Sequence, residues 1–103
     1  MLNGDIYEGE FKDGVFSGKG EMYYKNLNSQ EAVYRGMFRN HKRCGFGEMV
    51  WGDDKEKFLG NWNQDQRVKG ELQMLDGSVY IGEFKNDTFH GKGKLCFSKR
   101  LKP

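Results

Sequence analysis

Tyr80-Ile81-Gly82-Glu83-Phe84 places an aromatic residue, a glycine and a second aromatic residue at every other position. The same pattern occurs three more times along the chain, as Tyr7-Glu8-Gly9-Glu10-Phe11, Tyr34-Arg35-Gly36-Met37-Phe38 and Phe58-Leu59-Gly60-Asn61-Trp62. Four occurrences in 103 residues indicate an internal repeat, which has to be recognised before single elements are assigned.

Each copy of the pattern is followed by a polar loop and then by one or two glycines at a recurring offset. Three copies carry a Gly-x-Gly string: Gly18-Lys19-Gly20, Gly45-Phe46-Gly47 and Gly91-Lys92-Gly93. The third copy keeps only Gly70, and its alignment requires one residue fewer in the preceding loop, 63–69. Two apolar columns follow the glycines in every copy: Met22, Met49, Leu72 and Leu95, and then Tyr24, Trp51, Met74 and Phe97.

The period of two in these columns predicts strands, because alternate residues of a strand share one face. Each copy then places its aromatic residues, glycines and apolar columns on one face of two strands. The intervening positions are mostly polar, as at Glu8, Glu10 and Lys19. We therefore expect an all-β fold in which each copy is a β-hairpin with one partly wet face, and in which Phe11, Phe38, Trp62 and Phe84 are buried.

Turn residues agree with hairpin following hairpin. Asp13-Gly14 predicts a turn inside the first copy, and Gly4-Asp5, Gly52-Asp53 and Asp76-Gly77 predict turns between copies. The glycines at matched offsets leave room for a cross-strand aromatic ring to lie against the backbone. The linker 26–33 is longer than the linker 75–79, so we expect an irregular bulge there.

Composition narrows the class of protein. The length of 103 residues fits one domain, 1–103. The net charge of +2 is small, so we do not expect nucleic acid as a partner. The two cysteines cannot form a multi-bridge disulfide framework and favour a reducing compartment. We find neither a signal peptide nor an apolar run of about 20 residues, so a cytoplasmic location is expected.

The pattern Tyr-x-Gly-x-Phe/Trp, polar loop and His-Gly-x-Gly resembles the MORN (membrane occupation and recognition nexus) repeat. The match runs from Tyr7 to Phe97, and the fourth copy includes His90-Gly91-Lys92-Gly93, whereas Ser17 and Cys44 take the His position in the first two copies. The resemblance implies an elongated single-layer antiparallel sheet of four stacked hairpins, with repeats at about 7–29, 34–55, 58–77 and 80–98. Because residues 3–6 resemble residues 76–79, we expect a fragment of a longer array.

The resemblance also implies a range of functions. MORN repeats occur in cytoskeletal and ciliary proteins, in junctional membrane proteins, and as segments of lipid kinases, exchange factors and a lysine methyltransferase. Fold alone does not choose among these functions. We predict a non-catalytic protein-interaction or scaffolding module, associated with the cytoskeleton or a cilium. The alternatives are a regulatory segment of a larger enzyme and a phospholipid-binding module that tethers membranes.

Candidate catalytic and metal-binding residues are few. His41 and His90 lie in loops of different copies, and Cys44 and Cys96 show no Cys-x-x-Cys or His-x-x-x-His spacing. Asp53-Asp54 reads as a turn between hairpins. No phosphate-binding, nucleophile-elbow or zinc-protease string occurs, so we expect no enzyme activity, no metal and no cofactor.

The polar face offers the best candidates for binding a protein. In the second to fourth copies it carries the apolar residues Met37, Phe46, Val50, Leu59, Leu75 and Ile81, and the first copy offers only Tyr23. A contiguous apolar strip marks a contact site, and the residues predicted to bind a partner are Met37, Phe46, Val50, Leu59 and Ile81. Stacked hairpins would place Leu59 and Ile81 in one row. An equally open interpretation is that these residues pack beneath neighbouring loops. The expected partner is an amphipathic or extended protein segment whose basic residues meet the column Glu21, Glu48 and Glu71.

Two further kinds of contact follow from the surface. Acidic phospholipid is an alternative ligand for the basic residues Lys42, Arg43, Lys92 and Lys94, provided that they share one plane. Terminal strands with unpaired edges invite pairing with another chain, so self-association through these strands is also expected.

Overall fold

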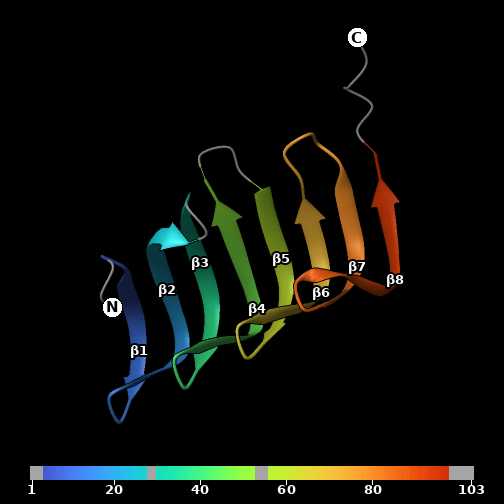
Figure 1. Cartoon of the computed structure of the whole chain (residues 1–103). Coiled ribbons are helices and arrows are strands. Elements are labelled where there is room, and N and C mark those ends of the chain that lie inside the picture. The colour runs from blue at the N-terminus through green and yellow to red at the C-terminus, as the bar shows by residue number, and fades with distance from the viewer. Residues whose placement is uncertain (1–3, 28–29, 53–55, 98–103) are drawn as a thin grey trace.

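The computed structural model describes residues 4–27, 30–52 and 56–97. These residues form one antiparallel sheet of eight strands whose spatial order is the order in sequence (Figure 1). The sheet is a single layer that measures 52 × 27 × 19 Å. The predicted all-β array of four hairpins is confirmed. The described part of the chain contains no helix able to span a membrane.

Each copy of the sequence pattern supplies two neighbouring strands. The first hairpin is β1 (Ile6–Lys12) and β2 (Val15–Leu27), and the second is β3 (Gln30–Arg39) and β4 (Lys42–Trp51). The third is β5 (Glu56–Asn63) and β6 (Gln66–Gln73), and the fourth is β7 (Val79–Lys85) and β8 (Thr88–Cys96). The expected loop 26–33 is wrong in extent, because β2 continues to Leu27 and β3 begins at Gln30. The expected irregularity is present as a register shift between Tyr24 and Leu27.

All four hairpins close with the same two-residue turn. Both turn residues have positive φ in each case, at Asp13-Gly14, Asn40-His41, Gln64-Asp65 and Asn86-Asp87. These are type I′ turns, whose twist matches that of the flanking strands. The sequence predicted only the first of them. Between hairpins, the Asp76-Gly77 turn is confirmed: the Ser78 amide donates to Asp76 Oδ1 at 2.8 Å. Gly52-Asp53 and Asp53-Asp54 extend outside the described residues.

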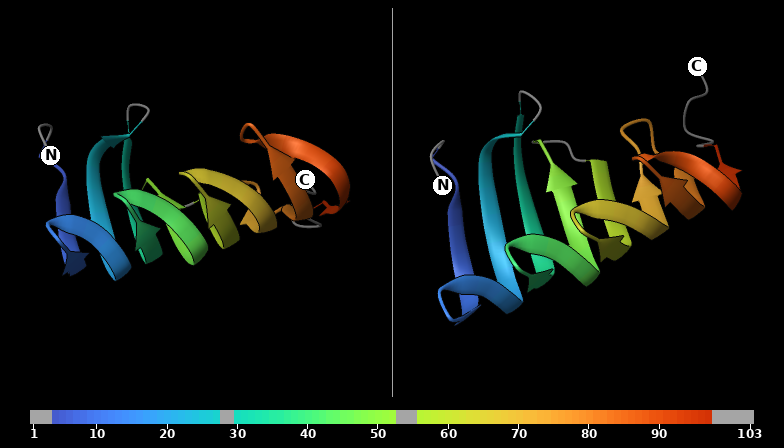
Figure 2. Two further views of the ribbon diagram at one scale, coloured as in Figure 1. Left: turned by 90° about the horizontal axis from the view of Figure 1, so that it is seen from below. Right: turned by 60° about the horizontal axis from the view of Figure 1, so that its bottom comes forward.

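A β-bulge follows the paired glycines of every hairpin. Between the pairs Gly9–Gly20 and Phe11–Phe16, β1 advances by two residues and β2 by four. In the third hairpin, between Gly60–Gly70 and Trp62–Arg67, β5 advances by two residues and β6 by three. The residue that this copy lacks is therefore missing from the bulge, and the turn is unchanged. The strands bend along their length, so that each hairpin curls (Figure 2).

The core lies on one face of the sheet, here called the aromatic face. Phe38, Trp62 and Phe84 are buried there, as predicted, but Phe11 is 58% exposed, so its expected burial is wrong. The reason is that each second aromatic is covered by the first aromatic of the preceding hairpin. Tyr34 packs edge-on against Trp62 with ring centroids 5.3 Å apart. Among the described residues no hairpin precedes β1, so Phe11 has no such cover.

The paired glycines make room for the first aromatic ring. A Cβ on Gly47 would lie 2.6 Å from Cε1 of Tyr34, so any side chain would collide with the ring. The Tyr34 hydroxyl reaches across the glycines and donates to the carbonyl oxygen of Met37 at 2.9 Å. Tyr7 and Tyr80 make the equivalent hydrogen bonds, to Glu10 and Glu83. The predicted packing reason for the glycines is confirmed.

Candidate functional site

The face opposite the aromatic rings, here called the open face, carries one row of side chains across the whole sheet. Successive strands contribute one cross-strand partner each: Glu8, Glu21, Arg35, Glu48, Leu59, Glu71, Ile81 and Lys94. The predicted alignment of Leu59 with Ile81 is confirmed, with Glu71 between them. The other residues of the open face are located by their position relative to this row.

A groove with a volume of about 580 Å³ crosses the open face over β2 to β5. Apolar side chains line it beside charged ones, with three glycines of adjacent strands between them: Lys19, Gly20, Glu21, Arg35, Gly36, Met37, Phe46, Gly47, Glu48 and Leu59. Phe46 is 58% exposed and Leu59 is 42% exposed. Large apolar side chains with this much exposure can bury substantial area against a partner.

The groove contains three of the five residues predicted to bind a partner, namely Met37, Phe46 and Leu59. Val50 is half-buried on β4 and lies opposite Val33 and Lys57 in the next row. Ile81 is exposed but stands two strands beyond Leu59, outside the groove lining. The structure therefore brings part of the predicted strip into one site and leaves Ile81 as a separate exposed residue.

Two residues of a neighbouring apolar row, Ile6 and Val33, were missed by the sequence interpretation. Ile6, Tyr23, Val33 and Val50 are successive cross-strand partners on β1 to β4. Ile6, Tyr23 and Val33 also line a smaller hollow of about 260 Å³. Ile6 precedes the five-residue pattern, and Val33 lies in the expected linker 26–33. Extending the alternation by one residue before each first aromatic would have found both.

Ion pairs within the sheet occupy part of the acidic column. Arg35 Nε lies 3.2 Å from Glu21 Oε2, and Lys57 Nζ lies 3.7 Å from Glu48 Oε2. The Tyr23 hydroxyl donates to Glu21 Oε1 at 2.7 Å. That hydrogen bond, together with Arg35, holds the pKa of Glu21 below its ordinary value. A basic partner would share these carboxylates with groups of the array itself.

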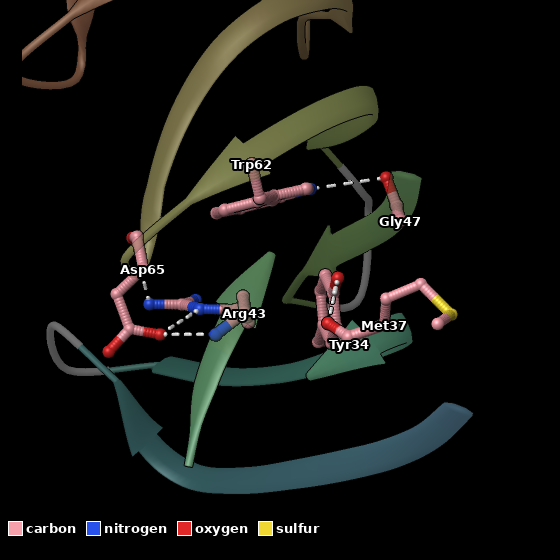
Figure 3. Close-up of polar contacts among 6 residues, drawn as sticks. All are labelled: Tyr34, Met37, Arg43, Gly47, Trp62 and Asp65. Carbon is pink, nitrogen blue, oxygen red and sulfur yellow. Dashed lines mark hydrogen bonds and ion pairs between the residues drawn. The ribbon is translucent and has the colours of Figure 1, made fainter. Parts of the chain in front are cut away.

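The four residues considered for phospholipid binding do not come together. Arg43 lies on the aromatic face, with its guanidinium carbon 4.9 Å from the Trp62 ring centroid and Nε 3.0 Å from Asp65 Oδ1 (Figure 3). Lys42 begins β4, whereas Lys92 and Lys94 lie on β8, four strands away. Binding of acidic phospholipid by these residues stays a prediction.

The histidines and cysteines are dispersed. His41 occupies a turn and packs against Phe16, with ring centroids 4.4 Å apart. His90 lies in β8 opposite Glu83, so its expected position in a loop is wrong. Cys44 and Cys96 are free thiols on β4 and β8. In the part of the chain that the structure describes, no three His, Cys, Asp or Glu residues are grouped as metal ligands would be.

Comparison with known families identifies the repeat. A family model described as MORN repeat matches residues 7–29, 34–55 and 80–100. The chain belongs to the MORN repeat family. The third hairpin lies outside the matched residues although it has the same two strands and turn as the others, which fits its shortened bulge.

Two curated relatives resemble nearly the whole chain. Alsin from Homo sapiens and from Mus musculus is 26% identical over 103 residues, which cover 95% of this chain and 6% of alsin. MORN repeat-containing protein 3 from Xenopus laevis is 34% identical over 99 residues, which cover 96% of this chain and 33% of that protein. The chain thus spans only a small part of alsin and about a third of the Xenopus protein.

Proposed function

We propose that this chain is a non-catalytic interaction module that binds an extended or amphipathic segment of a protein partner in the groove of the open face. MORN repeats in general mediate interactions with proteins or membranes. The groove favours a protein over a membrane as the partner, because exposed Phe46 and Leu59 lie in it beside charged side chains. An apolar floor with a charged rim is the usual anatomy of a peptide-binding surface.

The geometry suggests how such a segment is held. Met37, Phe46 and Leu59 come from three adjacent strands, β3, β4 and β5, so apolar anchors of a partner would cross the strands and lie along the array. Arg35 and Glu48 are cross-strand partners beside them and can set the register of polar groups. Central apolar contacts dominate affinity in such sites, and charges at the rim mainly affect the rate of association.

The test is selection of peptides on the purified chain, followed by calorimetric titration of the selected peptides. Leu59→Asp should weaken binding at least tenfold, because it places an unpaired charge in the apolar part of the groove. Leu75→Asp is the matched control, since Leu75 is 70% exposed in a loop outside the groove. Glu48→Lys should alter the association rate more than the dissociation rate.

The double variant Leu59→Asp/Ile81→Asp separates the groove from the longer strip. If partners use the groove alone, Ile81→Asp by itself leaves affinity unchanged and the double variant behaves as Leu59→Asp does. Unchanged binding by a folded Leu59→Asp chain would show that the partner uses another face. Unfolding of that variant would assign Leu59 to the core.

A second candidate is a regulatory segment within a larger protein. The match to alsin favours it, because the 103 residues that resemble this chain are only 6% of that protein. A full-length transcript from the source organism tests it directly. A reading frame that adds a catalytic domain supports this candidate, and a frame of repeats alone contradicts it.

A further inference from the structure

Every junction between hairpins obeys one register. The second strand of one hairpin pairs with the first strand of the next through a glycine pair: Gly20–Gly36, Gly47–Gly60 and Gly70–Gly82. Two residues beyond each glycine of the second strand, an apolar side chain pairs with the first aromatic of the next hairpin, as Met22 does with Tyr34. The junction rule therefore specifies which strand fits beside which.

The two outer strands of the sheet are of the two kinds that meet at each junction, because β8 is the second strand of a hairpin and β1 is the first strand of one. β1 and β8 lie at opposite ends of the array (Figure 1), and among the described residues each pairs on one side only. On β8, Phe89 is 47% exposed and Leu95 is 39% exposed. On β1, Ile6 and Phe11 are 56% and 58% exposed. Among the described residues, apolar side chains are thus exposed on both outer strands.

We propose that β8 of one copy of this chain pairs with β1 of a second copy, head to tail, in the register of the internal junctions. Gly93 then faces Gly9 of the second copy, and Leu95 faces Tyr7. Because the two edges differ, the pair of copies keeps one unpaired β1 edge and one unpaired β8 edge, and the association continues as a linear series.

The aromatic side chains complete one another in this arrangement. Within the chain, Tyr7 and Phe16 stack with centroids 3.8 Å apart, and Phe38 of the next hairpin packs edge-on against Tyr7 at 5.1 Å. Tyr80 and Phe89 stack in the same way at 4.0 Å. Phe11 of the second copy takes the place of Phe38 over this pair, which covers both Phe11 and Phe89.

The charges select this pairing over its alternatives. The register places Lys94 opposite Glu8 of the second copy and Lys92 opposite Glu10, and the internal pair Lys69–Glu83 already shows the second combination. Pairing β8 with β8 would bring Lys92 and Lys94 together, and pairing β1 with β1 would do the same with Glu8 and Glu10. Like charges directly opposite each other in a sheet are destabilising.

Sedimentation of charge variants tests the proposal. Glu10 Oε1 accepts a hydrogen bond from the Lys19 amide at 2.9 Å, so Glu10→Gln is used because it keeps an acceptor there. The first variant is Glu8→Lys/Glu10→Gln and the second is Lys92→Gln/Lys94→Glu. Each alone should associate at least about fivefold more weakly than the native chain at low ionic strength. An equimolar mixture should regain association, since its unlike edges are again complementary.

The control is Glu31→Lys/Glu71→Lys, which reverses two charges on the inner strands β3 and β6 and should associate as the native chain does. A native chain that stays monomeric at all concentrations overturns the proposal. Variants that associate alone as well as the native chain, or a mixture that does not recover, also overturn it.

A cross-link tests the register independently of affinity. The junction rule places Ile6 of the second copy opposite Cys96, which is an exposed free thiol. Under mild oxidation, Ile6→Cys/Cys44→Ser should give a ladder of disulfide-linked multimers on a non-reducing gel. Lys12→Cys/Cys44→Ser, with its thiol at the far end of β1, should give no such ladder. Dimers alone from the first variant would contradict the linear series.

Discussion

The indole Nε1–H of Trp62 donates a hydrogen bond to the carbonyl oxygen of Gly47, 3.2 Å away across the junction of the second and third hairpins. The ring is 4% exposed and packs edge-on against Tyr34 and Phe58, with centroids 5.3 and 5.4 Å away. Arg43 lies over its face. One side chain therefore joins two hairpins by packing and by a buried hydrogen bond. Stability of the array depends on such junctions, because each hairpin contacts only its neighbours.

Trp62→Ala should lower the free energy of unfolding by about 3 to 5 kcal/mol, because it empties a large aromatic site. Phe11→Ala is the comparison, since Phe11 has the same place in its own copy but is exposed. It should cost about 1 kcal/mol or less. Urea unfolding followed by circular dichroism measures both. Equal losses would show that burial does not distinguish the two positions.

The ion pair between Arg43 and Asp65 should couple the same two hairpins. The backbone N–H and Nε of Arg43 both donate to Asp65 Oδ1, and the Arg43 side chain is only 14% exposed. A double-mutant cycle with Arg43→Ala and Asp65→Ala should give a coupling of about 1 to 3 kcal/mol.

The surface pair Arg35–Glu21, with side chains 50% and 40% exposed, is the control for that cycle. Its coupling should not exceed about 1 kcal/mol, because water screens exposed pairs. If the coupling energy of Arg43 and Asp65 is no larger than that of the surface pair, the Arg43–Asp65 ion pair does not stabilise the junction of the two hairpins.

The repeat period in the sequence predicts on which face of the sheet a residue lies. It does not predict contacts between adjacent hairpins, and those contacts decide which aromatic residues are buried. Alternation places Phe11, Trp62 and Phe84 on the aromatic face, but burial also requires the first aromatic of a preceding hairpin. The described residues supply that cover for Trp62 and Phe84 and not for Phe11. The contacts of Arg43 with Trp62 and Asp65 depend on the Asn40-His41 turn and on the cross-strand register, which the repeat period alone does not predict.

The groove was found only in part for a related reason. Alternation and the stacking of hairpins place Met37, Phe46, Leu59 and Ile81 on one face, but they do not show which of these side chains line one groove. The structure does, and it leaves Ile81 two strands from Leu59 and outside the groove lining. The internal use of Glu21 and Glu48 in ion pairs depends on the same register and on rotamers, which a period cannot predict.

Alkaline pH should destabilise the array through Tyr34. Burial raises the pKa of its phenol above the ordinary value of 10.0. The unfolded chain therefore releases this proton first, so the stability from the neutral phenol is present below pH 10.0 and is lost as the pH rises toward the folded pKa.

Tyr34→Phe provides the test of that titration. At neutral pH it should cost about 1 kcal/mol, because the hydrogen bond to Met37 is lost. The difference in unfolding free energy between the native chain and Tyr34→Phe should then shrink above pH 10.0. Urea unfolding at a series of pH values measures it. A difference that stays constant with pH would show that Tyr34 does not titrate differently in the two states.

The third hairpin should accept the residue that its bulge lacks. Inserting a glycine between Val68 and Lys69 recreates the longer bulge of the second hairpin, where Arg43 holds the position of Arg67. The turn and the Gly60–Gly70 pair are then both retained, so we expect the free energy of unfolding to fall by about 1 kcal/mol or less.

A glycine between Gln64 and Asp65 is the comparison, because it lengthens a type I′ turn and moves Asp65 away from Arg43. Loss of those charge-assisted hydrogen bonds should cost at least about 2 kcal/mol. Urea unfolding gives the costs, and the amide resonance of Arg43, whose N–H donates to Asp65 Oδ1 at 2.8 Å, should shift only for the turn insertion. If the bulge insertion costs more than the turn insertion, the glycine pairs do not set the register of the hairpin.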